Sequence, residues 1–561
     1  MPHKSESNIK ISIREYDELS ISNINEGSVS FFNLGTTPRA NHSVDVEQLK
    51  VQLSDYIEAL PSSSAACFLC DSQTAMELIP IWKQSLKFRL WVAVRRENPI
   101  ERPGNLPDDH AALLIFTVDE KPFQHAKLQI EYSICPACNK TTKDYGGKKH
   151  LYSPYGTLMS DIWRDMRLGN CHNLVIDRLA DLFGVEPYIE LLSYDISESI
   201  IWIENEELPA EVPRSDNLLE SALINNDCIE ALGNLPESSI DFAFADPPYN
   251  INKKYDTWDD GIQIEEYFNW CDEWIDAIYR VLKPGAVFCI INIPLWVARH
   301  FLHAKQQYQF LDYICWEGLS LPVRNIMPAH YGLLSMSKGR ANPLARHDQE
   351  ISPTTKENAS MTIKEWYCVR QSCVKKRNTP NLADRQPITN IWWDIHRLKH
   401  NSRRVDHPCQ LPPDLMKRLI YTYTNEGDIV LDPFNGAGTT SLVAQLMNRK
   451  YIGIELSEKY HVIATERHQE INEGIDPFRK AERKISAKNS RVARRKKQKY
   501  VVSKKVLQLD VKRIAEELGK KPTKEEVKEL SKYPFEYFED YFIDWGEVCG
   551  AVGKKGMNEN I

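Results

Sequence analysis

The chain has 561 residues, of which 42% are hydrophobic and 26% charged, a composition typical of a globular protein with large cores. This composition excludes general disorder, and the length predicts about two to four domains. No run approaches the roughly 20 apolar residues of a membrane helix. The first residues also lack the apolar core of a secretory signal. A cytoplasmic protein with no membrane partner is therefore expected.

The net charge of −8 is distributed unevenly. Eleven Lys or Arg and a single acid, Glu482, lie between Arg479 and Lys499, so this stretch carries +10 and the remainder −18. An acidic body with one dense basic segment predicts a polyanionic partner. A solvated linker that contacts nothing explains the same composition.

Changes in sequence pattern divide the chain into five regions. They are an N-terminal segment (1–54), a globular region (55–195), a region of alternating strand and helix patterns (218–475), a basic linker (476–503) and a short module (504–554). In the third region we expect strands at 241–246, 286–293, 429–432 and 451–455, and helices at 266–282 and 440–447. This alternation predicts an α/β sheet.

The globular region repeats part of the third region. Residues 67–97 align without a gap on residues 289–319, and Trp91 then meets Tyr313. Further matches, in the same order, pair Phe88 with Phe310, His110 with His330, Cys135–Cys138 with Cys368–Cys373, and Asp161 with Asn390. We therefore expect residues 55–195 to be a degenerate second copy that lacks the two motifs described next. An unrelated DNA-reading domain is the alternative.

The first motif is Asp246-Pro-Pro-Tyr-Asn250, at the end of a strand pattern. Methylating an exocyclic amine of a base requires acceptors for the amine hydrogens, because the nitrogen lone pair is otherwise delocalised into the ring. Asp246 supplies a carboxylate, and two prolines stiffen the backbone so that the Pro247 carbonyl can be a second acceptor. Tyr249 offers a face on which an extruded base can stack. A strand-ending turn without chemistry is the alternative.

The second motif is Asp432-Pro-Phe-Asn-Gly-Ala-Gly-Thr-Thr440. A strand, a turn with Gly436 and Gly438, and then a helix bring backbone close to a nucleotide-like ligand. The third glycine of the dinucleotide fingerprint is absent, and without Gly-Lys-Ser/Thr a phosphate-binding P-loop is excluded. Glu455 ends the next strand, where an acid can accept hydrogen bonds from ribose hydroxyls.

With these motifs, residues 218–475 resemble the S-adenosylmethionine-dependent DNA amino-methyltransferases of the beta group, in which Asp-Pro-Pro-Tyr precedes the cofactor motif. Arg324–Gly339 and His407–Pro412 fit the same family. The resemblance implies an α/β fold with a Rossmann-like methyltransferase sheet, the second copy at the N-terminus and the small helical module being additions. It implies catalytic residues Asp246, Pro247, Pro248 and Tyr249, and cofactor-binding residues Asp227, Asp246, Asp432, Phe434, Asn435, Gly436, Gly438, Thr439 and Glu455.

The resemblance also implies double-stranded DNA as the partner and a target-recognition segment at about 335–405. Cations and tryptophans interleave there, as expected for phosphate contacts and base stacking, although a solvated surface over core tryptophans explains the same pattern. In this family Asp at the first motif position favours adenine N6 over cytosine N4. Cytosine N4, or a non-catalytic nucleic-acid-binding regulator on the same fold, are the alternatives. A cognate restriction nuclease is a candidate partner, and we expect a monomer with an internal pseudo-dimer or a homodimer.

The thirteen cysteines are scattered, which argues against a disulfide framework. Cys135 and Cys138 have zinc-knuckle spacing, and Cys368 and Cys373 form a looser pair. Together the two pairs are candidates for one zinc site of four thiolates. Two sets of buried thiols are the alternative.

Residues 504–554 are predicted to form short helices, one of which begins at Pro522-Thr523 before an acidic first turn. The module resembles the small helical repeat appended to homing endonucleases, which implies accessory DNA binding. A docking or dimerisation bundle is the alternative.

Overall fold

The computed structural model of the chain divides into two compact units, residues 1–140 with 157–480 and residues 141–156 with 481–561, and each is considered by itself. The residues that the structure describes are 10–15, 24–25, 27–39, 42–102, 104–119, 126–141, 157–169, 172–183, 190–204, 219–251, 261–318, 329–341, 361–363, 365–367, 371–377, 385–395, 410–478, 502, 504–542 and 545–549. Within these ranges no helix combines the length and the apolarity needed to cross a membrane.

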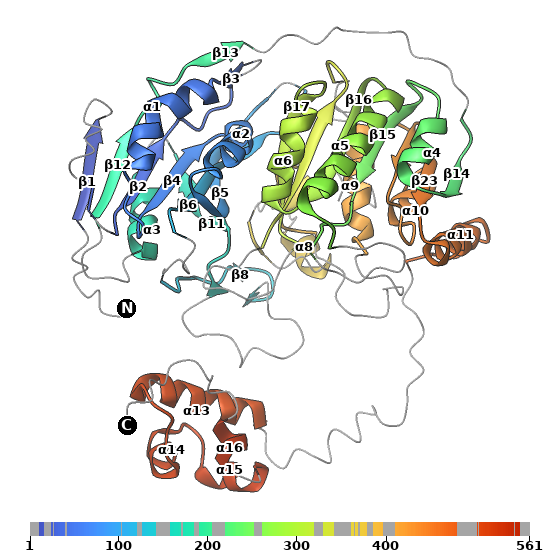
Figure 1. Cartoon of the computed structure of the whole chain (residues 1–561). Helices are drawn as coiled ribbons and strands as arrows, with labels where there is room; N and C mark the ends of the chain where they lie inside the picture. Colours follow the sequence, from blue (N-terminus) through green and yellow to red (C-terminus); the bar gives the residue numbers. More distant parts are fainter. Residues whose placement is uncertain are drawn as a thin grey trace. The chain divides into compact units, whose positions relative to one another are not determined.

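The second half of the chain builds an eight-stranded mixed sheet in the larger unit (Figure 1). From edge to edge its strands are β14 (Ala222–Asn225), β23 (Lys450–Glu455), β22 (Ile429–Asp432), β15 (Ile240–Ala245), β16 (Leu282–Asn292), β18 (Tyr331–Ser337), β17 (Gln309–Trp316) and β21 (Ile391–Trp392). Neighbours are parallel except that β18 is antiparallel to β16 and β17. The four strands expected from the sequence are confirmed as β15, β16, β22 and β23.

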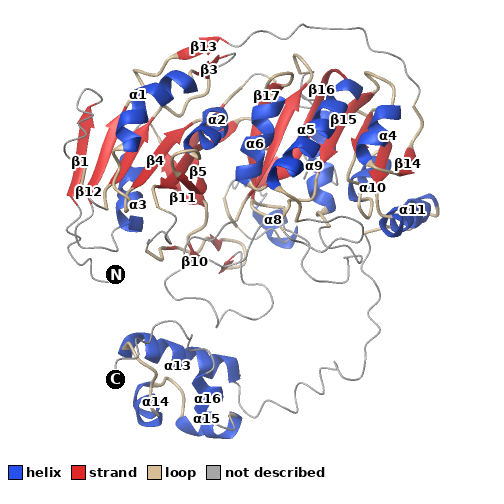
Figure 2. Cartoon of the chain, viewed as in Figure 1, coloured by secondary structure: helices blue, strands red, loops and turns tan. Residues whose placement is uncertain are grey.

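Two groups of helices cover this sheet (Figure 2). A separate apolar core lies under each group. The first group is α4 (Cys228–Asn234), α5 (Ile264–Val281) and α6 (Pro294–Ala304), and the second is α9 (Pro413–Tyr423), α10 (Thr439–Leu446) and α11 (Glu458–Asn472). Helix α5 buries Trp274 and Ile278, as their helical spacing predicts. Helices on both faces explain why the central strands are apolar throughout rather than alternating.

The N-terminal half builds a seven-stranded sheet. Its order is β1 (Lys10–Glu15), β12 (Glu190–Asp195), β2 (Val29–Asn33), β4 (Ala65–Cys70), β6 (Asp108–Thr117), β5 (Lys87–Ile100) and β11 (Ile162–Leu168). Only β6 is antiparallel to its neighbours β4 and β5. The helices of this half are α1 (Val46–Glu58), α2 (Ser72–Trp82) and α3 (Asn173–Phe183).

The N-terminal sheet has the strand order of the second sheet with one strand removed. The series β12-β2-β4-β6-β5-β11 corresponds in order and direction to β22-β15-β16-β18-β17-β21, and β1 pairs directly with β12 where the other sheet has β23 between β14 and β22. This is the order that a degenerate second copy predicts. The copy begins before residue 55, because β1 and β2 lie in the predicted N-terminal segment 1–54 but belong to this sheet.

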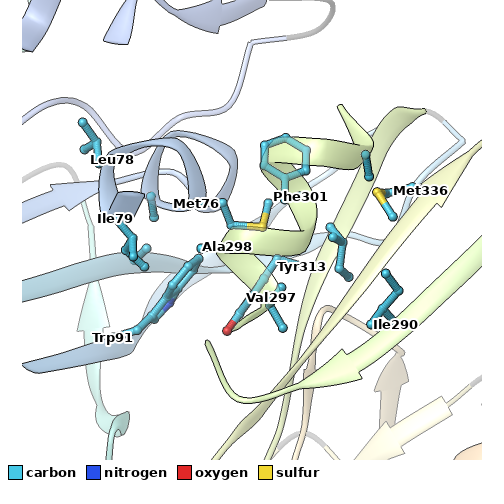
Figure 3. Packing of buried hydrophobic residues seen from close by; sticks show 14 of the residues in the cluster. Met76, Leu78, Ile79, Trp91, Ile290, Val297, Ala298, Phe301, Tyr313 and Met336 are labelled. Atoms are coloured by element: carbon cyan, nitrogen blue, oxygen red, sulfur yellow. The ribbon is translucent and has the colours of Figure 1, made fainter. Parts of the chain in front are cut away.

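The two copies pack through equivalent surfaces. Helix α2 lies against α6 (Figure 3). Trp91 stacks on Tyr313 with ring centroids 4.2 Å apart and planes inclined by 10°. Because Trp91 and Tyr313 are equivalent positions in the two copies, their contact lies where a twofold axis relating the copies would pass.

Polar contacts repeat on either side of this axis. His110 Nδ1 lies 3.1 Å from Asn390 Oδ1, and His330 Nδ1 lies 3.0 Å from Asp161 Oδ2. In each case the backbone N–H before the histidine donates to the same Asn or Asp side chain over 2.8 Å. Burial lowers the pKa of His110 to about 4, so this ring is neutral near pH 7. The same kind of contact therefore occurs on both sides of the interface between the two sheets.

The described residues also form four short two-stranded sheets and one further helix. They are β3 (His42–Val44) with β13 (Trp202–Glu204), β7 (Gln129–Ile130) with β10 (Thr157–Leu158), β8 (Ile134–Cys135) with β9 (Lys140–Thr141), β19 (Met361–Ile363) with β20 (Arg385–Pro387), and α8 (Gln371–Arg377).

The smaller unit is helical where it is described, as the sequence predicts. Its helices are α13 (Lys504–Leu518), α14 (Lys524–Leu530), α15 (Phe535–Tyr541) and α16 (Trp545–Val548). Thr523 caps α14 through a capping box with Glu526, which confirms the helix start read from the sequence. A small core that includes Leu507, Val511 and Phe538 holds the helices together.

Candidate active site

The segment after β15 folds back on itself at the carboxyl end of the sheet. The Tyr249 hydroxyl donates to Asp246 Oδ1 over 2.9 Å, so the first and last residues of the motif Asp-Pro-Pro-Tyr are joined. Asn250 has a positive φ of 53°, a backbone conformation that Asn tolerates better than most residues. The turn therefore fixes the carboxylate and the ring of Tyr249 next to one another.

Two aromatic side chains outside the motif hold it in place. Tyr267 of α5 donates its hydroxyl to the Pro248 carbonyl over 2.7 Å, and Trp296 Nε1 of α6 donates to the Tyr249 carbonyl over 2.8 Å. Sequence reasoning missed both residues, because an aromatic side chain on an amphipathic helix has the pattern of an ordinary core residue. No local signal distinguishes them.

The glycine turn after β22 approaches the neighbouring strand closely. Gly436 and Gly438 have positive φ values of 50° and 85°, which explains glycine at both positions. A Cβ on Gly453 of β23 would lie 2.6 Å from the Asn435 side chain, so β23 also needs a glycine here. Asn435 Oδ1 is buried without a protein partner, and it therefore remains an acceptor for a ligand.

Glu455, at the end of β23, accepts two backbone hydrogen bonds. Gly436 N donates to Oε2 and Ser457 N donates to Oε1, each over 2.8 Å. Burial raises the pKa of Glu455, although these bonds oppose the rise. The bonds join the glycine turn to the next strand, and each carboxylate oxygen keeps a second lone pair for a ligand hydroxyl.

Asp432 is a buried acid at the end of β22. Burial raises its pKa from 3.8 to about 7. Hydrogen bonds from the Thr440 hydroxyl and the Phe434 N–H lower it, and the charges of Asp246 and Glu455 raise it further. The charges of Asp246 and Glu455 therefore act on Asp432, an arrangement that a positively charged ligand would complement.

The other predicted cofactor residues, Phe434, Thr439 and Asp227, differ in their contacts. Phe434 packs edge-on against Trp270 and Trp274 of α5, with ring centroids 5.7 and 5.2 Å apart. Thr439 is the first residue of α10. Asp227 caps α4 by accepting from the N–H groups of the second and third residues that follow it, so its observed contacts are those of a helix cap.

The N-terminal copy lacks these acids. Val29 pairs with Ala65 as Phe242 pairs with Val287, and counting along the strands puts Asn33 at the position of Asp246. The same register puts a serine, Ser193, at the position of Asp432. The strand equivalent to β23, which carries Glu455, is the one that this sheet omits. Along these two described strands the N-terminal copy therefore has no acid at the positions of Asp246 and Asp432.

Three of the four predicted zinc ligands lie together. The sulfur atoms of Cys135, Cys138 and Cys373 all lie within 4.8 Å of one another. Cys368 lies outside the described residues, as do most of the predicted recognition segment 335–405 and nearly all of the linker 476–503.

The profile of the DNA methylase family (N6_N4_Mtase) matches residues 240–466. The type II methyltransferase M.HpaI of Haemophilus parainfluenzae is 32% identical over 263 residues, which are 46% of this chain and 77% of that protein. The DNA adenine methyltransferase YhdJ of Escherichia coli strain K12 is 31% identical over 244 residues, 42% of this chain and 79% of that protein. The type II methyltransferase M.BamHI of Bacillus amyloliquefaciens is 35% identical over 237 residues, 42% of this chain. The chain spans about half the length of M.BamHI, since the match covers 54% of it.

Solved structures of related folds match the same share of the chain. The cytosine-N4-specific PvuII DNA methyltransferase is 19% identical, with 44% of this chain and 86% of that chain covered and a TM-score of 0.32. The complex of M1.HpyAVI with SAM is 20% identical, with 44% and 98% covered and a TM-score of 0.28.

Proposed function

The chain belongs to the DNA methylase family, and from that premise we propose that it transfers a methyl group from S-adenosylmethionine to the exocyclic N6 amine of adenine in double-stranded DNA. The observation that carries the proposal is the placement of the Asp246–Tyr249 turn beside the buried acids Asp432 and Glu455 at the carboxyl ends of adjacent strands. Ligands of open α/β sheets bind at this edge.

The acids fit the proposed cofactor. S-adenosylmethionine carries a sulfonium and an ammonium group, and when bound it supplies an activated methyl group. Asp432 and Asp246 would balance its positive charge, and Glu455 would accept hydrogen bonds from its ribose hydroxyls. Asn435 Oδ1, which has no hydrogen-bond partner among the described residues, is a further acceptor for a polar group of the cofactor. Phe434 and Trp270 would bound the pocket with apolar surface.

Asp246 would hold the target amine. A carboxylate has about four lone-pair sites, so Asp246 can accept an amine hydrogen beside the bond from the Tyr249 hydroxyl. Accepting hydrogens from the amine localises the nitrogen lone pair and makes the nitrogen a better nucleophile. Tyr249 would stack on the extruded base, beside Tyr331 at a ring distance of 6.1 Å.

Adenine is favoured by the aspartate at the first motif position and by the similarity to an enzyme named as a DNA adenine methyltransferase. Cytosine N4 is the second candidate, because the family profile that the chain matches is named for both the N6 and the N4 amine. Incubating the full chain with DNA and isotopically labelled S-adenosylmethionine, followed by mass spectrometry of the nucleosides, distinguishes the two. Labelled N6-methyladenine supports the proposal, labelled N4-methylcytosine replaces the base, and no label in DNA supports a non-catalytic DNA-binding protein.

We further propose that one chain supplies the two-copy arrangement that a dimer would otherwise form, with a cognate restriction nuclease as a candidate partner in the cell. The support is the pseudo-twofold interface between the copies. Mass measurement in solution tests it, since a monomer at all concentrations is expected.

A further inference from the structure

We propose that Cys135, Cys138 and Cys373 bind a zinc ion that fastens the N-terminal copy to the recognition segment of the catalytic copy. Cys135 and Cys138 belong to the β8–β9 hairpin of the N-terminal half, and Cys373 belongs to α8 of the second half. The site goes beyond methyl transfer, because it lies in neither strand-end motif.

The spacing of the three sulfurs fits a metal better than a disulfide. A tetrahedral zinc ion with Zn–S distances of about 2.3 Å separates its sulfur ligands by about 3.8 Å. A disulfide needs about 2.05 Å between two sulfurs and leaves a third unused. The observed group has three sulfurs within 4.8 Å of one another. Among the described residues no fourth Cys, His, Asp or Glu joins the group, so three thiolates define the site.

The local backbone is built to bring these sulfurs together. Asn139 follows the cysteine pair with a positive φ of 50°, and its N–H donates to the Cys135 carbonyl over 2.8 Å. This closes the hairpin so that both sulfurs face the same side. On α8, Cys373 and Arg377 are four residues apart and therefore share a helix face. Both are buried.

Arg377 provides a second, independent observation. Its Nη1 donates to Cys135 Sγ over 2.8 Å, and the residue as a whole is only 2% exposed. Outer partners of this kind orient metal ligands.

The neighbouring contacts show what the metal would hold. Glu365, before α8, accepts from Arg167 over 3.0 Å, and the Arg95 guanidinium lies 5.0 Å from the centre of the Trp366 ring. The segment before α8 therefore packs against the N-terminal half of the chain. Lys375 and Lys376 are exposed on α8, away from the buried face. Given the proposed function, zinc would fix α8 with these two lysines directed at the DNA backbone.

Metal content tests the site apart from activity. The full chain, expressed with zinc and dialysed without chelator, is expected to hold about one zinc per chain. The variants C138S and C373S are expected to hold close to none, while the control C549S, which removes a buried cysteine of the smaller unit, keeps it. Full-length chain without zinc, or zinc that persists in both variants, would overturn the site.

Cobalt substitution of the wild-type chain avoids any question of whether the variants fold. Tetrahedral ligand-field bands with thiolate-to-cobalt charge transfer are expected, and their absence contradicts the proposal.

The double variant K375A/K376A tests the orientation of α8. It is expected to keep zinc and to reduce the magnitude of the slope of log DNA affinity against log salt by about 2. Zinc removal by chelator is expected to weaken DNA binding while S-adenosylmethionine affinity stays unchanged. If zinc binds but methyl transfer is absent, the metal site stands and the proposed function fails.

Discussion

Replacing Asp432 by Asn tests whether a buried acid is kept, at a cost in stability, for a cationic ligand. Without ligand, burial raises the pKa of Asp432 from 3.8 to about 7. The unfolded chain then binds fewer protons than the folded chain between about pH 4 and 7. The free energy of unfolding therefore falls as the pH rises through this interval, and this loss is complete above about pH 7.

The magnitude follows from the same values. Each unit of pKa difference corresponds to about 1.4 kcal/mol, so the rise from 3.8 to about 7 costs about 4 kcal/mol once Asp432 is ionised. Asn is neutral at every pH and has nearly the shape of protonated Asp. D432N should therefore match the wild type near pH 4 and exceed its free energy of unfolding by about 4 kcal/mol at pH 8.

The assay is urea unfolding of the full chain without cofactor from about pH 4 to 8, followed by tryptophan fluorescence. Twelve of the 13 tryptophans lie in the larger unit, so the signal reports its unfolding. Asp195, at the end of the corresponding strand of the N-terminal sheet, is the control. Its pKa is lowered, because bonds from Ser197 and Asn33 outweigh burial, so D195N should lose stability at neutral pH. A D432N advantage that is equal at pH 5 and pH 8 would refute the reasoning.

The affinity for the cofactor should rise with pH, whereas the free energy of unfolding falls. A cation favours ionised Asp432, so the affinity of the wild type for S-adenosylmethionine should fall by up to about tenfold per pH unit below about pH 7. D432N should bind weakly at every pH, although it is the more stable protein. Titration calorimetry measures the affinity of the wild type and of D432N for S-adenosylmethionine. A D432N variant that binds as tightly as the wild type excludes Asp432 from the cofactor site.

D246N should abolish methyl transfer while S-adenosylmethionine affinity stays within about tenfold, and substantial residual turnover would contradict the role given to this carboxylate. W91A should lower the free energy of unfolding of the larger unit by about 3–5 kcal/mol, because it removes the ring that stacks on Tyr313, and a loss under 1 kcal/mol would show that the copies pack without this contact. Replacing the six Lys and Arg of residues 491–499 by Gln should weaken binding to all DNA sequences and lower the salt slope by up to about 5, whereas an unchanged slope indicates a linker that contacts no phosphate.

The sequence by itself determined four strands of the second sheet, the two motifs and the family, because these depend on local order. The run that becomes β15 leads into Asp246, and the run that becomes β22 leads into Gly436, so periodicity and turn chemistry suffice to place them. The capping box at Thr523 is equally local. The order of matches between the halves was enough to predict a second copy.

Only the tertiary structure decided which distant residues meet. β2 is an interior strand of the N-terminal sheet and pairs with strands from residues 65–70 and 190–195. Its own sequence does not indicate which strands these are. For the same reason Tyr267 and Trp296 were missed. The raised pKa of Asp432 comes from burial and from the charges of Asp246 and Glu455. Asp246 precedes it by 186 residues, which no window of sequence contains. The sulfur of Cys373 lies within 4.8 Å of the sulfurs of Cys135 and Cys138, from the other half of the chain. The sequence supplied the residue types, and only the tertiary structure brought them together.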